Sequence, residues 1–148
     1  MEKAIRTLVE LEAEAARFVR GLARGLASRE RGATFVTLQG ELGAGKTAFT
    51  QAVARALDVT ETVTSPTFVL EKIYLLNGRQ FKRLIHIDAY RLEKAGDLAP
   101  LGFDELVQDA GNLILLEWPE KVSDALPIPA VRISFVAHTD GSRTITYD

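Results

Sequence analysis

The stretch that decides the fold reads Gly40-Glu41-Leu42-Gly43-Ala44-Gly45-Lys46-Thr47, and it fulfils the pattern G-x-x-x-x-G-K-[ST]. Residues 33–39 precede it and predict a buried strand, while residues 48–57 follow with apolar side chains at helical spacing. A strand, a glycine-rich loop and a helix in this order are the setting in which such a loop binds phosphates. The sequence therefore predicts a phosphate-binding loop, and a glycine-rich turn without a ligand is the alternative.

The residue types of this loop indicate what it would bind. Its glycines permit backbone angles closed to other residues, so that successive N–H groups can turn toward one polyphosphate, and the following helix adds unpaired amides. We expect Lys46 to reach the β- and γ-phosphates of ATP and the Thr47 hydroxyl to bind Mg²⁺. The predicted nucleotide-binding residues here are Gly40, Glu41, Leu42, Gly43, Ala44, Gly45, Lys46, Thr47 and Ala48.

A carboxylate at the end of a second buried strand is the predicted partner of Thr47 at the metal. Residues 112–116 are apolar apart from Asn112 and lead directly into Glu117. Such a run is typical of a central parallel strand that is buried on both faces, beside the strand at 33–39. We therefore favour Glu117 as the metal-side carboxylate, with a surface strand end as the alternative.

Asp88 is a competing strand-end carboxylate. It ends the apolar run 83–88, and we expect it to act on the attacking water or on the loop near Ser65. The predicted catalytic residues are therefore Asp88, Lys46 and Glu117. A helix cap or an ion pair with Arg91 is the alternative for Asp88.

Residues 58–67 are rich in hydroxyl groups and contain Pro66, which indicates a loop. The loop is either a polar connection or a switch-like segment in which Ser65 or Thr67 senses the γ-phosphate. Trp118, next to Glu117, is likewise open to two interpretations, a core anchor or a functional wedge.

The remaining patterns predict one α/β domain over residues 1–148. Its sheet is expected to be central and mostly parallel, with added antiparallel hairpin strands and helices on both faces. The expected elements are a helix over 8–26, hairpin strands at 68–76 and 81–88 around Asn77-Gly78, short helical pieces within 94–107, and strands at 131–137 and 144–147.

Composition narrows the function further. The chain has 148 residues and no cysteine, which excludes disulfides and thiolate chemistry. Its net charge of −2 means that it lacks the overall positive charge that proteins use to bind RNA without a partner. The sequence contains no apolar run of membrane-spanning length, and its N-terminus does not resemble a signal peptide. We therefore expect a cytoplasmic protein that makes no contact with a membrane.

Four motifs in order resemble the TsaE (YjeE) family across nearly the whole chain. They are Leu38-Gln39-Gly40 to Thr47, Ser65-Pro66-Thr67-Phe68, His86-Ile87-Asp88-Ala89-Tyr90-Arg91 and Leu116-Glu117-Trp118-Pro119-Glu120. The resemblance implies a Mg²⁺-dependent ATPase of tRNA N6-threonylcarbamoyladenosine synthesis that acts with the TsaD and TsaB proteins and meets tRNA only through that complex. It also implies ATP binding by Gly43 to Thr47, Mg²⁺ binding by Thr47 and Glu117, a hydrolytic role for Asp88 and a switch-like loop at Ser65 to Thr67.

Two other functions share the phosphate loop. A small-molecule or nucleoside kinase would need a lid with arginines, but residues 92–111 contain none. A nucleotide-dependent binding switch would show negligible turnover. ATP hydrolysis by the isolated chain is expected to be slow, because the sequence identifies no definite arginine finger. Arg91 is the one candidate.

Overall fold

A seven-stranded mixed sheet forms the centre of the protein. The structure is a computed structural model that describes residues 1–25, 32–61, 71–78 and 80–148. The strands stand in the order β1-β7-β6-β2-β5-β4-β3. Their bounds are β1 Glu2–Ile5, β2 Thr34–Gln39, β3 Glu71–Leu75, β4 Arg83–Asp88, β5 Asn112–Glu117, β6 Val131–Ala137 and β7 Arg143–Tyr147.

The four central strands, β6, β2, β5 and β4, run parallel to one another. The outer pairs β1–β7, β6–β7 and β3–β4 are antiparallel, so the sheet is mixed. The prediction of a central parallel sheet with added antiparallel strands agrees with this arrangement. The sequence prediction missed β1, whose short charged segment becomes a strand by pairing with β7.

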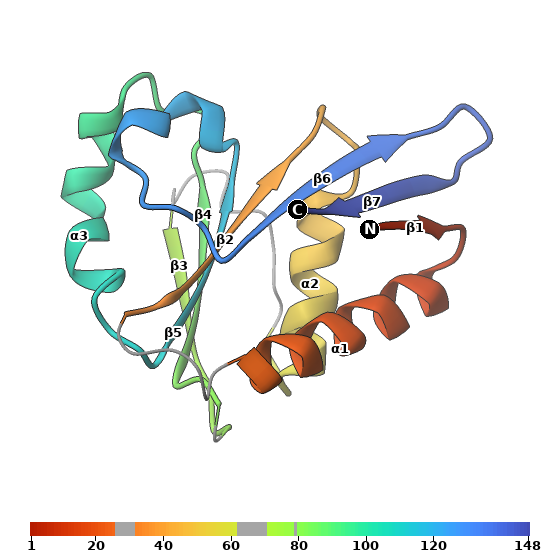
Figure 1. Cartoon of the computed structure of the whole chain (residues 1–148), viewed down its shortest axis with the longest axis horizontal. Coiled ribbons are helices and arrows are strands. Elements are labelled where there is room, and N and C mark those ends of the chain that lie inside the picture. Colours follow the sequence, from red (N-terminus) through yellow and green to blue (C-terminus); the bar gives the residue numbers. More distant parts are fainter. Residues whose placement is uncertain (26–31, 62–70, 79) are drawn as a thin grey trace.

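Helices cover both faces of the sheet, as predicted (Figure 1). On one face lie α1 (Leu8–Gly25) and α2 (Lys46–Ala56), and on the other lie the short helix α3 (Phe103–Leu106) and the 3-10 helix η2 (Ala95–Leu101). Two further 3-10 turns, η3 (Pro119–Lys121) and η4 (Ser123–Ala125), follow β5. Each face has its own apolar cluster, so the sheet separates two cores.

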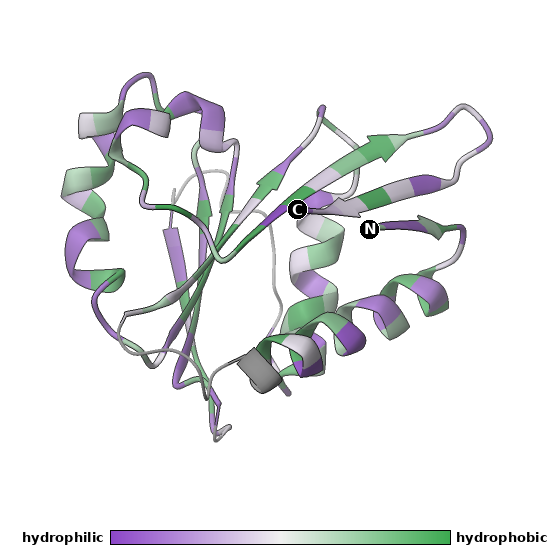
Figure 2. Ribbon diagram, in the orientation of Figure 1, coloured by the Kyte–Doolittle hydropathy of each residue, from purple (hydrophilic) through white to green (hydrophobic). Residues whose placement is uncertain are grey.

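The long N-terminal helix α1 is amphipathic, and green and purple bands alternate along it in Figure 2. The Thr7 side chain caps its start, because the Glu10 amide donates to Thr7 Oγ1 at 3.1 Å, and Glu10 Oε2 accepts from the amide of Arg6, the residue before the cap, at 2.6 Å. Its buried face includes Phe18, whose ring lies 5.5 Å from that of Phe49 on α2. The two helices thus pack together over the sheet. Among the described residues, no helix is both long and apolar enough to cross a membrane.

The register of the central strands determines where the functional side chains meet. Leu38, near the end of β2, stands opposite Glu117 on β5, and Glu117 in turn stands opposite Asp88 on β4. The predicted position of residues 112–117 beside the strand at 33–39 is therefore confirmed. Because parallel strands end at the same edge of a sheet, both carboxylates lie at the edge from which the glycine-rich loop departs.

Candidate functional site

The loop between β2 and α2 has a shape that requires glycine. Gly43 and Gly45 adopt positive φ angles of 79° and 112°. A Cβ at Gly40 would lie 2.6 Å from the carbonyl oxygen of Phe135, and one at Gly45 would lie 3.0 Å from Cδ of Arg143. The loop therefore turns tightly against β6 and β7: a side chain at Gly40 would collide with the β6 backbone, and one at Gly45 would displace Arg143 slightly besides straining its positive φ.

Unpaired backbone amides collect at the start of α2. The N-cap residue Gly45 offers no side-chain hydrogen bond, and the first helical bond runs from the Phe49 amide to the Gly45 oxygen at 2.9 Å. The amides of residues 46–48 therefore remain without an intrahelical acceptor, as at any helix N-terminus. The Ala44 amide is different, since it donates to the Glu41 oxygen at 3.0 Å and fixes the turn of the loop. This end of α2 is suited to an anion.

Lys46 is held inside the loop. Its side chain is buried, and its ammonium donates hydrogen bonds to the carbonyl oxygens of Gly40 and Glu41, the second at 3.0 Å. The same nitrogen lies 4.2 Å from the centre of the Trp118 ring, a cation–π contact. Burial lowers the pKa of Lys46, although the neighbouring Glu117 and Asp88 oppose this shift. The lysine is thus placed at the loop, where an incoming anion would meet it.

Thr47 and Glu117, the two predicted metal ligands, meet across 70 residues of sequence. The Thr47 hydroxyl donates to the Glu117 carboxylate and lies 3.3 Å from each of its oxygens. Glu117 is only 3% exposed, and its Oε2 is also hydrogen-bonded to Nε2 of His86. A carboxylate and a hydroxyl side by side are oxygen donors of the kind that Mg²⁺ prefers.

Asp88 lies beside this pair and is half-buried. Its Oδ1 accepts a hydrogen bond from the Tyr90 amide at 3.0 Å, so it caps the turn that follows β4, in partial agreement with the capping alternative. Burial raises the pKa of Asp88, and the nearby Glu117 raises it further, while the Tyr90 hydrogen bond and the His86 and Lys46 charges oppose the rise. Asp88 is thus a carboxylate with weakened acidity at the edge of the site.

Trp118 packs at the edge of a core and also lies next to Lys46. Its side chain is half-buried and packs against the apolar cluster on the α3 face of the sheet. It also contacts the Lys46 ammonium and lies 5.0 Å from the Tyr90 ring. The backbone of Trp118 has a positive φ of 61°, a strained conformation for an aromatic residue, which places the ring at the site.

The structure places two further residues here for which the sequence predicts no role at this site. His86 belongs to one of the four motifs, and alternation along β4 puts it on the same face as Asp88. Arg143 on β7 donates through Nη2 to the Gly43 oxygen at 3.1 Å, and no local pattern could link residues 100 positions apart. Both contacts arise from the tertiary fold.

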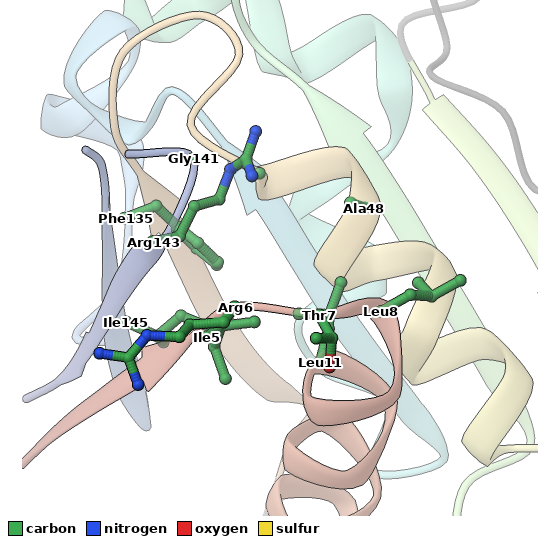
Figure 3. A pocket seen from close by; sticks show the side chains of 11 residues that line it. Ile5, Arg6, Thr7, Leu8, Leu11, Ala48, Phe135, Gly141, Arg143 and Ile145 are labelled. Atoms are coloured by element: carbon green, nitrogen blue, oxygen red, sulfur yellow. The ribbon is translucent and has the colours of Figure 1, made fainter. Parts of the chain in front are cut away.

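A cavity of about 270 Å³ opens beside the loop (Figure 3). Apolar side chains from the N-terminal segment, α1 and the β6–β7 hairpin form most of its wall, and Arg143 extends along it toward the loop. Its lining includes Ile5, Leu8, Leu11, Ala48, Phe135 and Ile145.

One expectation cannot be placed on this geometry. Ser65 and Thr67, predicted to lie in a switch-like loop, fall outside the described residues. No group of three or more histidine and carboxylate side chains arranged to hold a metal occurs in the described part of the chain. Any Mg²⁺ here would therefore take further oxygen ligands from phosphates or water, as is common for this ion.

Comparison with known proteins agrees with the resemblance seen in the motifs. The family model described as "Threonylcarbamoyl adenosine biosynthesis protein TsaE" matches residues 11–145. The TsaE protein of Treponema pallidum is 42% identical over 111 residues, covering 75% of this chain and 78% of its own. That of Bacillus subtilis is 38% identical over 112 residues, covering 76% of this chain and 67% of its own.

The fold points to the same family. The crystal structure of Bacillus subtilis YdiB superposes with a TM-score of 0.72 at 28% identity, covering 99% of this chain and 83% of that one. The family match spans most of the sequence, including the glycine-rich loop and both strand-end carboxylates. The chain therefore belongs to the TsaE family of threonylcarbamoyl adenosine biosynthesis proteins.

Proposed function

We propose that this chain is a Mg²⁺-dependent ATPase that supports tRNA N6-threonylcarbamoyladenosine synthesis, together with TsaD and TsaB proteins. The observation that carries the proposal is the convergence of an anion-binding helix start, a buried lysine and a hydroxyl–carboxylate pair at one edge of the sheet. Family membership supports the pathway, and the geometry supports the nucleotide.

The triphosphate would lie along the loop and the start of α2. The amides of residues 46–48 would donate to phosphate oxygens, and Lys46 would exchange its bonds to the Gly40 and Glu41 carbonyls for bonds to the phosphates. Arg143, already in contact with the loop at the Gly43 carbonyl, would add a second cation. The adjacent apolar cavity would take the nucleoside.

Thr47 and Glu117 would hold the metal ion. Their oxygens already lie within hydrogen-bond distance, so the donor set fits Mg²⁺ without rearrangement of β5 or α2. When bound, Mg²⁺ would neutralise charge on the phosphates. Asp88, with its raised pKa and its place beside Glu117, is suited to orient or deprotonate the attacking water.

The test of nucleotide binding is to titrate a fluorescent ATP analogue into the purified protein with and without Mg²⁺. The parent should bind it in a Mg²⁺-dependent manner, and Lys46→Ala should weaken binding at least about tenfold, as expected for loss of one charged hydrogen-bond donor. Lys121→Ala is the matched control, because Lys121 is exposed and its ammonium lies over the Tyr90 ring instead of the loop. Equal binding by Lys46→Ala and the parent would refute the site.

Partner binding is tested by a pull-down of purified TsaD and TsaB with the tagged chain, carried out with ATP, with ADP and without nucleotide. Capture that depends on nucleotide, together with slow ATP turnover in the same sample, is expected. Nucleotide-dependent capture without turnover would instead indicate a binding switch. Phosphate transfer to an added nucleoside would indicate a kinase.

A further inference from the structure

His86 is a buried polar residue whose purpose the proposed function leaves unexplained. It lies in the middle of β4 with no side-chain exposure, and its Nε2 is hydrogen-bonded to Oε2 of Glu117. Its other ring nitrogen, Nδ1, has no hydrogen-bond partner in the part of the chain that the structure describes. The hydrogen bonding seen for this ring is therefore directed at Glu117.

The bond to His86 distinguishes the two oxygens of Glu117. The Thr47 hydroxyl lies 3.3 Å from both oxygens, so it does not fix the rotation of the carboxylate about its last bond. An ionised carboxylate can only accept, so His86 must donate through Nε2, and it does so to Oε2. One oxygen is thus held by the ring, while the other is left on the side of Thr47.

We propose that His86 is a positioning residue that orients Glu117 for the metal ion. This inference rests on the proposed function, because it assigns Mg²⁺ to the Thr47–Glu117 pair. His86 would not touch the ion. It would keep the buried carboxylate in one orientation before Mg²⁺ arrives, as hydrogen bonds to metal ligands generally do. A carboxylate that is 3% exposed is also costly to leave without such a donor.

The test compares two substitutions that separate the hydrogen bond from the volume of the ring. His86→Phe keeps a ring but removes the donor, while His86→Gln keeps a nitrogen donor on a flexible chain. Binding of a non-hydrolysable ATP analogue is measured at increasing free Mg²⁺. His86→Phe should raise the Mg²⁺ concentration for half-maximal binding by about 10- to 100-fold, the range for lost outer-shell contacts, and His86→Gln should restore much of that loss. Binding with chelator present should be equal in all three proteins.

A second measurement needs neither metal nor a stable variant at position 86. In the metal-free parent, the ring-nitrogen NMR signals of His86 should change when Glu117→Gln is introduced, since the ring donates to that carboxylate. The signals of His138, which is hydrogen-bonded to Thr144 elsewhere, should stay the same.

Different results would refute the role of His86 and the proposed Mg²⁺ site. If the parent binds the analogue only with Mg²⁺ and His86→Phe reaches half-maximal binding at the same Mg²⁺ concentration, His86 only fills space in the core and the inference is wrong. His86 signals that ignore Glu117→Gln would also overturn it. If the parent itself binds the analogue without regard to Mg²⁺, the proposed metal site fails and this inference fails with it.

Discussion

At the scale of single residues, Lys46 is held by contacts from the glycine-rich loop and from Trp118. Its ammonium bonds to the Gly40 and Glu41 carbonyls and lies over the Trp118 ring. A cation–π contact contributes between about 0.5 and 2 kcal/mol, so phosphate oxygens can displace it. The lysine is kept in place by contacts weak enough to be exchanged.

Trp118 should therefore report nucleotide binding. It is the single tryptophan of the chain, and its ring lies 4.2 Å from the Lys46 ammonium. We expect its emission to change when Mg²⁺ and an ATP analogue are added, because the lysine turns toward the phosphates. The variant Lys46→Ala should start with altered emission and respond little. Unchanged emission in a parent sample that demonstrably binds nucleotide would show that Lys46 stays over the ring.

The residues of the site differ in how well sequence could predict them. Thr47 and Glu117 could be paired in advance, because a loop motif and an apolar strand end each restrict where a side chain can lie. Asp88 was placed at the correct edge, but its hydrogen bond to the Tyr90 amide depends on the turn after β4. The contact of His86 with Glu117 depends on strand register, and register is set by the assembled sheet.

At the scale of elements, the β6–β7 hairpin completes the site from the other end of the chain. The sequence predicted α1 and α2 from their apolar repeats, and it predicted the β3–β4 and β6–β7 strands from turn residues between strand-like runs. Periodicity could not reveal that β7 brings Arg143 to the glycine-rich loop or that β1 joins the sheet. Those facts depend on pairing between segments far apart in sequence.

Arg143 gives the prediction that belongs to this scale. Arg143→Ala should weaken binding of the ATP analogue about 10- to 100-fold, since a hydrogen bond to a charged group contributes about 1.5–3 kcal/mol. Arg143→Lys should lose less, because it keeps the charge. The control is Arg83→Ala, since Arg83 pairs with Asp109 at the other end of β4. If both alanine variants bind alike, the hairpin contributes no cation to the nucleotide.

At the scale of the whole molecule, a polar cluster connects α1 to β7. The Tyr147 hydroxyl donates to the buried Glu14 carboxylate, and Arg17 forms an ion pair with the same group while lying over the Tyr147 ring. Burial of Glu14 alone would raise its pKa, but the Arg17 and Tyr147 hydrogen bonds outweigh it and hold that pKa below its usual value. Burial also raises the pKa of Tyr147, which keeps its hydroxyl a donor.

This cluster predicts how stability depends on pH. Because the pKa of Glu14 is lower in the folded than in the unfolded protein, the carboxylate stabilises the fold above about pH 4.5, and this contribution is lost as the pH falls further. Glu14→Gln should therefore lower the free energy of unfolding at neutral pH and flatten its decline in acid. Urea titrations at several pH values measure both effects.

Glu12→Gln on the same helix is the control for that series. Glu12 pairs with Arg55 at the surface, where both side chains are nearly half exposed, and exposed pairs contribute little. The pH profile of this variant should match that of the parent. A profile of Glu14→Gln that also matched the parent would mean that the cluster does not link folding to acidity.

The pairing of β1 with β7 has a consequence for biosynthesis. A ribosome makes β1 and the cavity-lining start of α1 early, yet β1 has no neighbour in the sheet until residues 143–147 have been translated. The same late segment supplies Arg143 and Ile145 to the cavity wall. A nascent polypeptide that stops short of β7 would thus carry the complete glycine-rich motif and still lack one wall of the neighbouring cavity, so the cavity would be completed only after β7 has been made.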